Sequence, residues 1–163
     1  MNTLTNTNMV RSSIQIFLTI VLCLSGSTGM AADCCDVQKE FINSNQSFTQ
    51  VVTVSSGGVK TLYVSGQVGI QDGQVPESFT EQVDTVFANM ARQLEAAGAT
   101  MADVIKLTGF IVDIDPDKVA QYGQVRSRHF PAANPPASTL VGVSGLVRES
   151  FLVEVEAVAV ISD

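Results

Sequence analysis

The sequence predicts an α+β domain in which two helices cover one face of a mixed β-sheet. Three observations support this prediction. Turn residues separate short apolar segments rich in β-branched residues, one longer segment has helical periodicity, and helix-start residues precede two segments. In chain order the expected elements are ββαβαββ, which is typical of helices layered on a sheet.

The first two strands are expected to form a hairpin. Residues 50–55 (QVVTVS) and 59–67 (VKTLYVSGQ) are rich in β-branched residues, and Gly57-Gly58 between them supplies a turn. Residues 68–76 then form a loop.

The first helix has the clearest signals. Ser78 is the expected N-cap, and Glu81 stands at the third helical position, which together predict a capping box. The apolar positions that follow are spaced by three and four and form one stripe: Phe79, Val83, Val86, Phe87, Met90, Leu94 and Ala97. Gly98 is typical of the residue that ends a helix.

The second half of the chain repeats this alternation of strand and helix. Residues 104–114 predict a third strand, and Asp115-Pro116 starts a second helix that runs to about Phe130. Residues 138–146 and 151–161 are the last two expected strands. Because both helices lie on one face, the other sheet face needs a cover, and oligomerisation is the natural solution.

Two glutamates interrupt the last apolar strand. Strand side chains alternate between faces, so Glu154 and Glu156 are expected on the same side of the sheet. This pattern indicates either a half-solvated sheet face or a functional site. If the side is buried, each acid needs a partner or its pKa rises.

The first 32 residues resemble a secretory signal. Arg11 precedes an apolar run over residues 14–24, small residues follow, and cleavage is expected after Ala31 or Ala32. The run is shorter than the ~20 residues of a membrane span. We therefore expect an exported protein, periplasmic or secreted, with no membrane attachment after cleavage; an uncleaved anchor is the alternative. Residues 33–47 are expected to be flexible, and the domain to occupy residues 48–163.

Charge and composition argue against several kinds of site. The formal net charge is −7 and there is no basic stripe, which opposes nucleic-acid binding. Cys34 and Cys35 are adjacent and far in sequence from the single histidine, His129, so no metal site is expected. His129 is interpreted as a residue that interacts with the dipole at a helix C-terminus.

Several motifs, in this order and spacing, resemble the RidA/YjgF family. They are Tyr63-Val64-Ser65-Gly66-Gln67, Leu94-Glu95-Ala96-Ala97-Gly98, Val104-Ile105-Lys106-Leu107-Thr108, Pro136-Ala137-Ser138 and Val153-Glu154-Val155-Glu156-Ala157. The resemblance covers residues 48–161. It implies a chorismate-mutase-like fold and a homotrimer whose sheets enclose a barrel, with small-molecule ligands in clefts between subunits.

The resemblance also implies an activity. Members of this family hydrolyse reactive enamines and imines to a 2-oxo acid and ammonia, without a metal or organic cofactor. An arginine clamps the substrate carboxylate, and a glutamate on the last strand positions water and protons. By position that glutamate is Glu154, the catalytic candidate, and the family's strand serine is Ser65, next to Gly66.

The other implied substrate-binding positions depart from the family pattern. The clamp arginine falls at Ser138, the cleft cysteine at Leu140, the helix asparagine at Gly123 and the N-terminal tyrosine at Phe48. A serine cannot replace a planar cationic fork, so the substrate is expected to differ. Other arginines that could supply the charge, or else remain solvated on the surface, are Arg126, Arg128 and Arg148.

Three functions stay open from the sequence. The first is a deaminase with an altered substrate, in which Glu154 is the general acid and base and Ser65 orients substrate or water. The second is a non-catalytic trimer, binding or chaperone-like, that holds an apolar small ligand; Leu140 and Phe48 favour it. In the third, Glu154 only hydrogen-bonds backbone at a subunit interface.

Overall fold

The computed structural model describes residues 36–163. The elements in chain order are β1 (Gln38–Ser44), β2 (Thr49–Ser56), β3 (Val59–Val68), α1 (Phe79–Ala96), the short 3₁₀ helix η1 (Met101–Asp103), β4 (Val104–Val112), α2 (Pro116–His129), β5 (Ala137–Val143) and β6 (Val153–Ser162).

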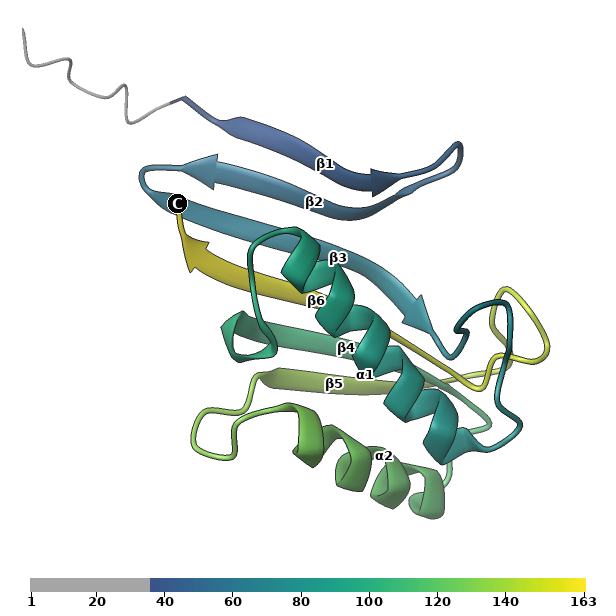
Figure 1. The fold of residues 1–163 in the computed structure, drawn as a ribbon. Helices are drawn as coiled ribbons and strands as arrows, with labels where there is room; N and C mark the ends of the chain where they lie inside the picture. The colour runs from purple at the N-terminus through teal and green to yellow at the C-terminus, as the bar shows by residue number, and fades with distance from the viewer. Residues whose placement is uncertain (1–35) are drawn as a thin grey trace, which may run out of the picture. The chain divides into compact units, whose positions relative to one another are not determined.

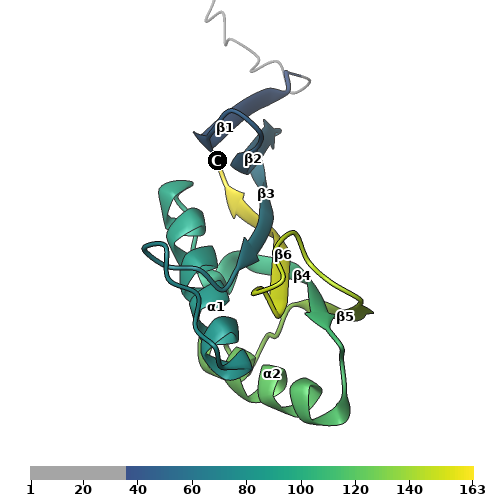
Figure 2. The same cartoon turned by 90° about the vertical axis from the view of Figure 1, so that its right-hand side faces the viewer.

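The strands form one six-stranded sheet in the order β1-β2-β3-β6-β4-β5. Neighbouring strands are antiparallel except β4 and β5, which are parallel and are connected by α2. Both helices lie on the same face of the sheet (Figures 1 and 2). The predicted mixed sheet with two helices on one face is therefore confirmed.

The N-terminal part of the domain corrects the prediction. Residues 33–47 were expected to be flexible, but Gln38–Ser44 forms β1 and pairs with β2 from Gln38 opposite Ser55 to Ser44 opposite Thr49. This strand was missed because almost all of its side chains are exposed, so it lacks the alternation that indicates a half-buried strand. The element order is consequently βββαβαββ, and the domain begins before residue 48.

The expected caps hold the two helices, with one difference. The Ser78 hydroxyl accepts a bond from the Glu81 N–H at 3.5 Å, and the Asp115 carboxylate accepts one from the Lys118 N–H at 2.7 Å. A reciprocal capping box forms instead at η1, between Thr100 and Asp103. The strand predicted over residues 138–146 is shorter and ends at Val143.

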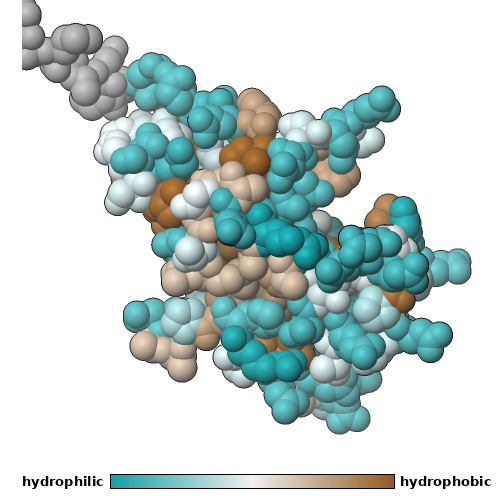
Figure 3. Space-filling view, viewed as in Figure 1, coloured by the Kyte–Doolittle hydropathy of each residue, from teal (hydrophilic) through white to brown (hydrophobic). Residues whose placement is uncertain are grey.

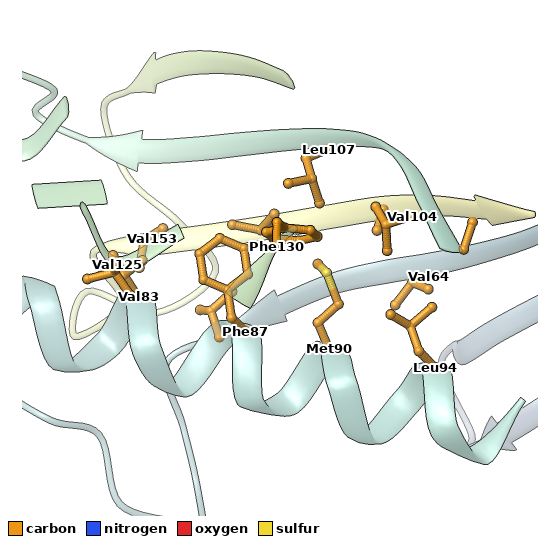
Figure 4. Packing of buried hydrophobic residues seen from close by; sticks show 14 of the residues in the cluster. Val64, Val83, Phe87, Met90, Leu94, Val104, Leu107, Val125, Phe130 and Val153 are labelled. Atoms are coloured by element: carbon orange, nitrogen blue, oxygen red, sulfur yellow. The ribbon is translucent and has the colours of Figure 1, made fainter. Parts of the chain in front are cut away.

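The core lies between the helices and the sheet. Phe87, Met90 and Leu94 of α1 are fully buried and point toward the strands, where they meet residues such as Leu107 and Val64 (Figure 4). The predicted apolar stripe of α1 is therefore its buried face. By contrast, the outer surface on the side of the helices is largely hydrophilic (Figure 3).

The sheet face opposite the helices carries an apolar row. Phe41, Val52, Tyr63 and Val158 stand directly opposite one another across β1, β2, β3 and β6. Phe41 and Tyr63 are 64% and 52% exposed. No helix among residues 36–163 covers this face, which is the uncovered face that the sequence predicts.

Some predictions concern residues that the structure does not describe. The signal over residues 1–32 with its cleavage site, and Cys34 and Cys35, lie outside the described range. Within that range, no helix has both the length and the apolar character needed to cross a membrane.

Candidate active site

A β-bulge shapes the site where β3 pairs with β6. Val64 stands opposite Ala157, but the next pair joins Gln67 to Val155, so three steps along β3 match two along β6. The extra residue lies at Ser65-Gly66. A bulge bends its strand and redirects the neighbouring side chains, which is why bulges often occur beside active sites.

The carboxylate of Glu154 packs directly on this bulge. A Cβ atom added to Gly66 would overlap Glu154 Oε1 and would lie only 2.7 Å from Glu154 Cδ. Residue 66 must therefore be glycine if Glu154 is to keep its position. The glycine is needed for this close approach and not for an unusual backbone angle, because its φ is not in the positive region.

Hydrogen bonds fix the bulge from the side of β2. The Ser65 hydroxyl donates to the Thr49 carbonyl at 2.7 Å. The buried Gln67 amide donates to Gln50 Oε1 at 2.8 Å and to the Ser65 carbonyl at 2.9 Å. Because the Ser65 hydroxyl donates its proton to the Thr49 carbonyl, it can only accept a hydrogen bond from a ligand.

Glu154 and Glu156 share a sheet face but not a site. Val153, Val155 and Ala157 alternate with them and are buried against the helices. Glu154 is half-buried, and burial, followed by the charge of Glu156, raises its pKa above the usual carboxyl value. Glu156 is exposed and lines a separate hollow of about 290 Å³.

Glu154 opens into a cavity of about 670 Å³, large enough for a small organic ligand. Four of the residues expected from the sequence line it together: Glu154, Ser65, Gly66 and Phe48. Sequence reasoning did not identify several other lining residues, among them Asn89, Arg92, Asp72, Val147 and Phe151.

Asn89 of α1 connects the cavity wall to the helix. Its amide donates to the carbonyls of Val68 and Ile70, both at 2.9 Å, and its Oδ1 accepts a bond from Arg92. The sequence shows only that Asn89 precedes Arg92 by three residues on the predicted helix, whereas its burial at 7% exposure appears in the structure alone. Asn89 ties the loop after β3 to the helix and holds Arg92 beside the cavity.

Among the three arginines considered from the sequence, only Arg148 lines the cavity. Its guanidinium lies 5.5 Å from the centre of the Phe151 ring. Arg128 instead approaches Asp84 at 3.8 Å, and Arg126 bonds to the Pro136 carbonyl. His129, the last residue of α2, places Nε2 2.9 Å from Asp84 Oδ1.

The remaining expected site residues do not reach this cavity in a single chain. Gly123 is exposed on α2 with open space around it, and Ser138 is exposed on β5 at the sheet edge. Leu140 packs on the core beside Gly109. Residues 36–163 contain no group of three metal-ligating side chains.

Comparison with known proteins finds one matching family model and several similar sequences. The family model for endoribonuclease L-PSP matches residues 38–161. A RutC family protein from Aquifex aeolicus is 36% identical over 102 residues, which cover 61% of this chain and 79% of the relative. The 2-iminobutanoate/2-iminopropanoate deaminase of Rattus norvegicus is 32% identical over 118 residues, which cover 69% of this chain and 79% of the relative.

A solved structure shows the same fold. RidA from an Antarctic Psychrobacter species superimposes with a TM-score of 0.62 at 27% identity, over 77% of this chain and 98% of that one. The bulge, the glutamate and the cavity described above therefore lie on a fold that is known from other proteins.

The contact between Gly66 and Glu154 predicts the effect of one methyl group. Gly66→Ala should displace the carboxylate toward solvent, so the pKa of Glu154, followed by carboxyl NMR titration, should fall toward its ordinary value. Gly145→Ala is the control, because a Cβ there meets nothing within 4 Å. An unchanged Glu154 titration in Gly66→Ala would contradict this geometry.

The raised pKa of Glu154 predicts a pH-dependent stability. The folded state binds this proton more tightly than the unfolded state. The stability that Glu154 contributes is therefore complete below the ordinary carboxyl pKa and is lost as pH rises through the raised pKa of the folded state. Glu154→Gln should therefore gain stability relative to wild type across that window in urea unfolding experiments. Glu156→Gln should narrow the pH range over which this stability is lost, since the charge of Glu156 contributes to the raised pKa of Glu154. A difference between wild type and Glu154→Gln that does not vary with pH would contradict the prediction.

Proposed function

Because the chain belongs to the endoribonuclease L-PSP family, the RidA/YjgF family, we propose that it hydrolyses reactive enamines or imines to a carbonyl product and ammonia. One observation carries the proposal. A carboxyl group with a raised pKa is fixed against a glycine bulge and opens into a cavity of ligand size.

Glu154 has the chemistry that this hydrolysis needs. As a carboxylate it accepts a proton from water while the water oxygen attacks the carbon of the protonated imine, which gives a neutral carbinolamine. As a carboxylic acid it returns this proton to the carbinolamine nitrogen. The C–N bond then breaks while the hydroxyl proton passes to the carboxylate, which leaves a C=O group and ammonia, and the ammonia departs with that proton as ammonium. An enamine enters the same sequence by taking a proton on carbon, which gives the protonated imine. A raised pKa brings both protonation states closer to neutral pH, which favours acid and base catalysis by one group.

A neighbouring copy of the chain would complete the cleft. Ser138, Leu140 and Gly123 lie on β5 and α2, away from the Glu154 cavity of the same chain. Across the helix-free face, the row from Phe41 to Val158 offers apolar surface to other subunits. Both observations support a homotrimer with ligand clefts between subunits.

A non-catalytic trimer that binds a small ligand, or acts like a chaperone, is the alternative. The half-exposed Phe48 ring at the cavity favours it, because an apolar wall binds ligands without chemistry. Although the family model is named after an endoribonuclease, the net charge of −7 opposes binding to RNA phosphates. We also propose that residues 1–32 direct export of the protein. In either function, the protein would then meet its substrate or ligand outside the cytoplasm.

Ammonia release tests the enzymatic proposal. An amino-acid oxidase generates a panel of imino acids, and purified protein should accelerate the release of ammonia above the buffer rate. Glu154→Gln should reduce this acceleration by about 10²–10⁴-fold, because the amide cannot exchange the proton. Glu156→Gln, outside the cavity, is the matched control and should keep most of the activity. If wild type and Glu154→Gln both give the buffer rate across the panel, the protein is not a deaminase.

Sedimentation tests the assembly. Wild type should sediment as a trimer, and Tyr63→Lys should shift it toward monomer, because the lysine places a charge in the apolar row. Ala96→Lys, on the exposed end of α1, should leave the trimer intact. A wild-type monomer at micromolar concentration would exclude the cleft between subunits.

A further inference from the structure

Two arginines on different elements line the Glu154 cavity. Arg92 comes from α1, and Arg148 from the link between β5 and β6. Within residues 36–163 neither forms an ion pair with a carboxylate. We propose that they bind the carboxylate of the substrate in place of the arginine that is missing at Ser138, and that this substrate is an imino acid with a large apolar side chain. The inference rests on the proposed function for its reaction, but not for its binding site.

Arg148 is held beside the cavity by a cation–π contact. Its guanidinium carbon lies over the Phe151 ring, 5.5 Å from the ring centre. Phe151 is itself buried at 3% exposure. This contact uses no N–H donor of the guanidinium, so the donors remain available to a carboxylate.

Arg92 is held by a different contact. Its guanidinium donates to Asn89 Oδ1, and Asn89 is fixed by one bond to the last residue of β3 and one to the loop that follows. One of the five guanidinium N–H groups satisfies that amide oxygen, and the others stay available to an anion. The two cations thus reach the cavity from separate anchors, and loss of one does not release the other.

Asp72 is the charge that opposes this assignment. It lines the same cavity as Glu154, so two carboxylates accompany the two arginines. Asp72 is exposed on a surface turn, where water weakens its effect on a bound anion. Direct, charge-assisted bonds to guanidinium edges are stronger than such screened repulsion. Asp72→Asn should accordingly strengthen anion binding.

The apolar walls define the rest of the ligand. Phe48 and Val147 line the cavity while 51% and 84% exposed, so both have surface that a ligand would remove from water. A cavity with cations at one side and apolar walls at another fits a carboxylate that carries a bulky apolar group. This favours a bulky α-imino acid over the smallest ones.

Three stable probes separate charge from size in isothermal titration calorimetry: 3-phenylpropanoate, propanoate and 3-phenylpropanamide. The phenyl acid should bind at least about tenfold more tightly than propanoate, because the ring buries apolar surface. It should also bind at least about tenfold more tightly than the amide, because only the acid makes charge-assisted bonds.

Variants then assign the charge. Arg148→Gln and Arg92→Gln should each weaken phenylpropanoate binding about tenfold and leave the amide unchanged. Arg128→Gln is the matched control, an exposed arginine outside the cavity, and should bind as wild type does. Equal affinity of wild type for acid and amide overturns the inference without any variant. Unchanged phenylpropanoate binding in the Arg92→Gln, Arg148→Gln double variant overturns it as well.

The outcomes distinguish this inference from the proposed function. Binding that depends on the two arginines, in a protein that releases no ammonia, supports the anion site and rejects the deaminase. Ammonia release that is lost in Glu154→Gln but not affected by the double variant, for the imine of phenylalanine, supports the deaminase and rejects the anion site.

Discussion

The close approach of the Glu154 carboxylate to Gly66, which leaves no room for a Cβ atom, determines the site. It requires three features together: an extra residue in β3, a glycine at that residue, and a glutamate on the facing side of β6. Because β3 and β6 are central strands, packed against α1 through Leu62 and Val155, the bulge cannot shift without disturbing the core. The strands thereby hold a carboxylate partly away from water, and this partial burial is the main cause of its raised pKa.

Much of the fold was predictable because the buried face of a helix or strand requires apolar residues at regular spacing in the sequence. The stripe from Phe79 to Leu94 follows the period of a helix, and Asp115-Pro116 marks a helix start whatever the tertiary context. The absence of such a pattern is also why the sequence did not predict β1. It is an edge strand that is held by backbone bonds to β2 and buries almost nothing, so its side chains show no periodic signal.

The site was predictable only in part. Strand alternation places Glu154 and Glu156 on one face, and the family resemblance selects Glu154, but neither reveals that the bulge brings one carboxylate onto Gly66 while the other stays exposed. Arg92 and Arg148 have no distinctive spacing to each other or to Glu154. Their presence at one cavity depends on the path of the loop between β5 and β6 relative to α1, which local sequence does not specify.

This arrangement separates the carboxylate that would react from the groups that would select the ligand. Glu154 and Gly66 lie on paired strands, whose backbone hydrogen bonds fix their positions relative to each other. Arg92, Arg148 and Phe48 are exposed, on a helix surface and on connecting segments that can change without disturbing the core. The serine at position 138 therefore does not by itself imply loss of chemistry at Glu154. A cation supplied from another element would leave the carboxylate in place and would change only the shape of ligand that fits between them.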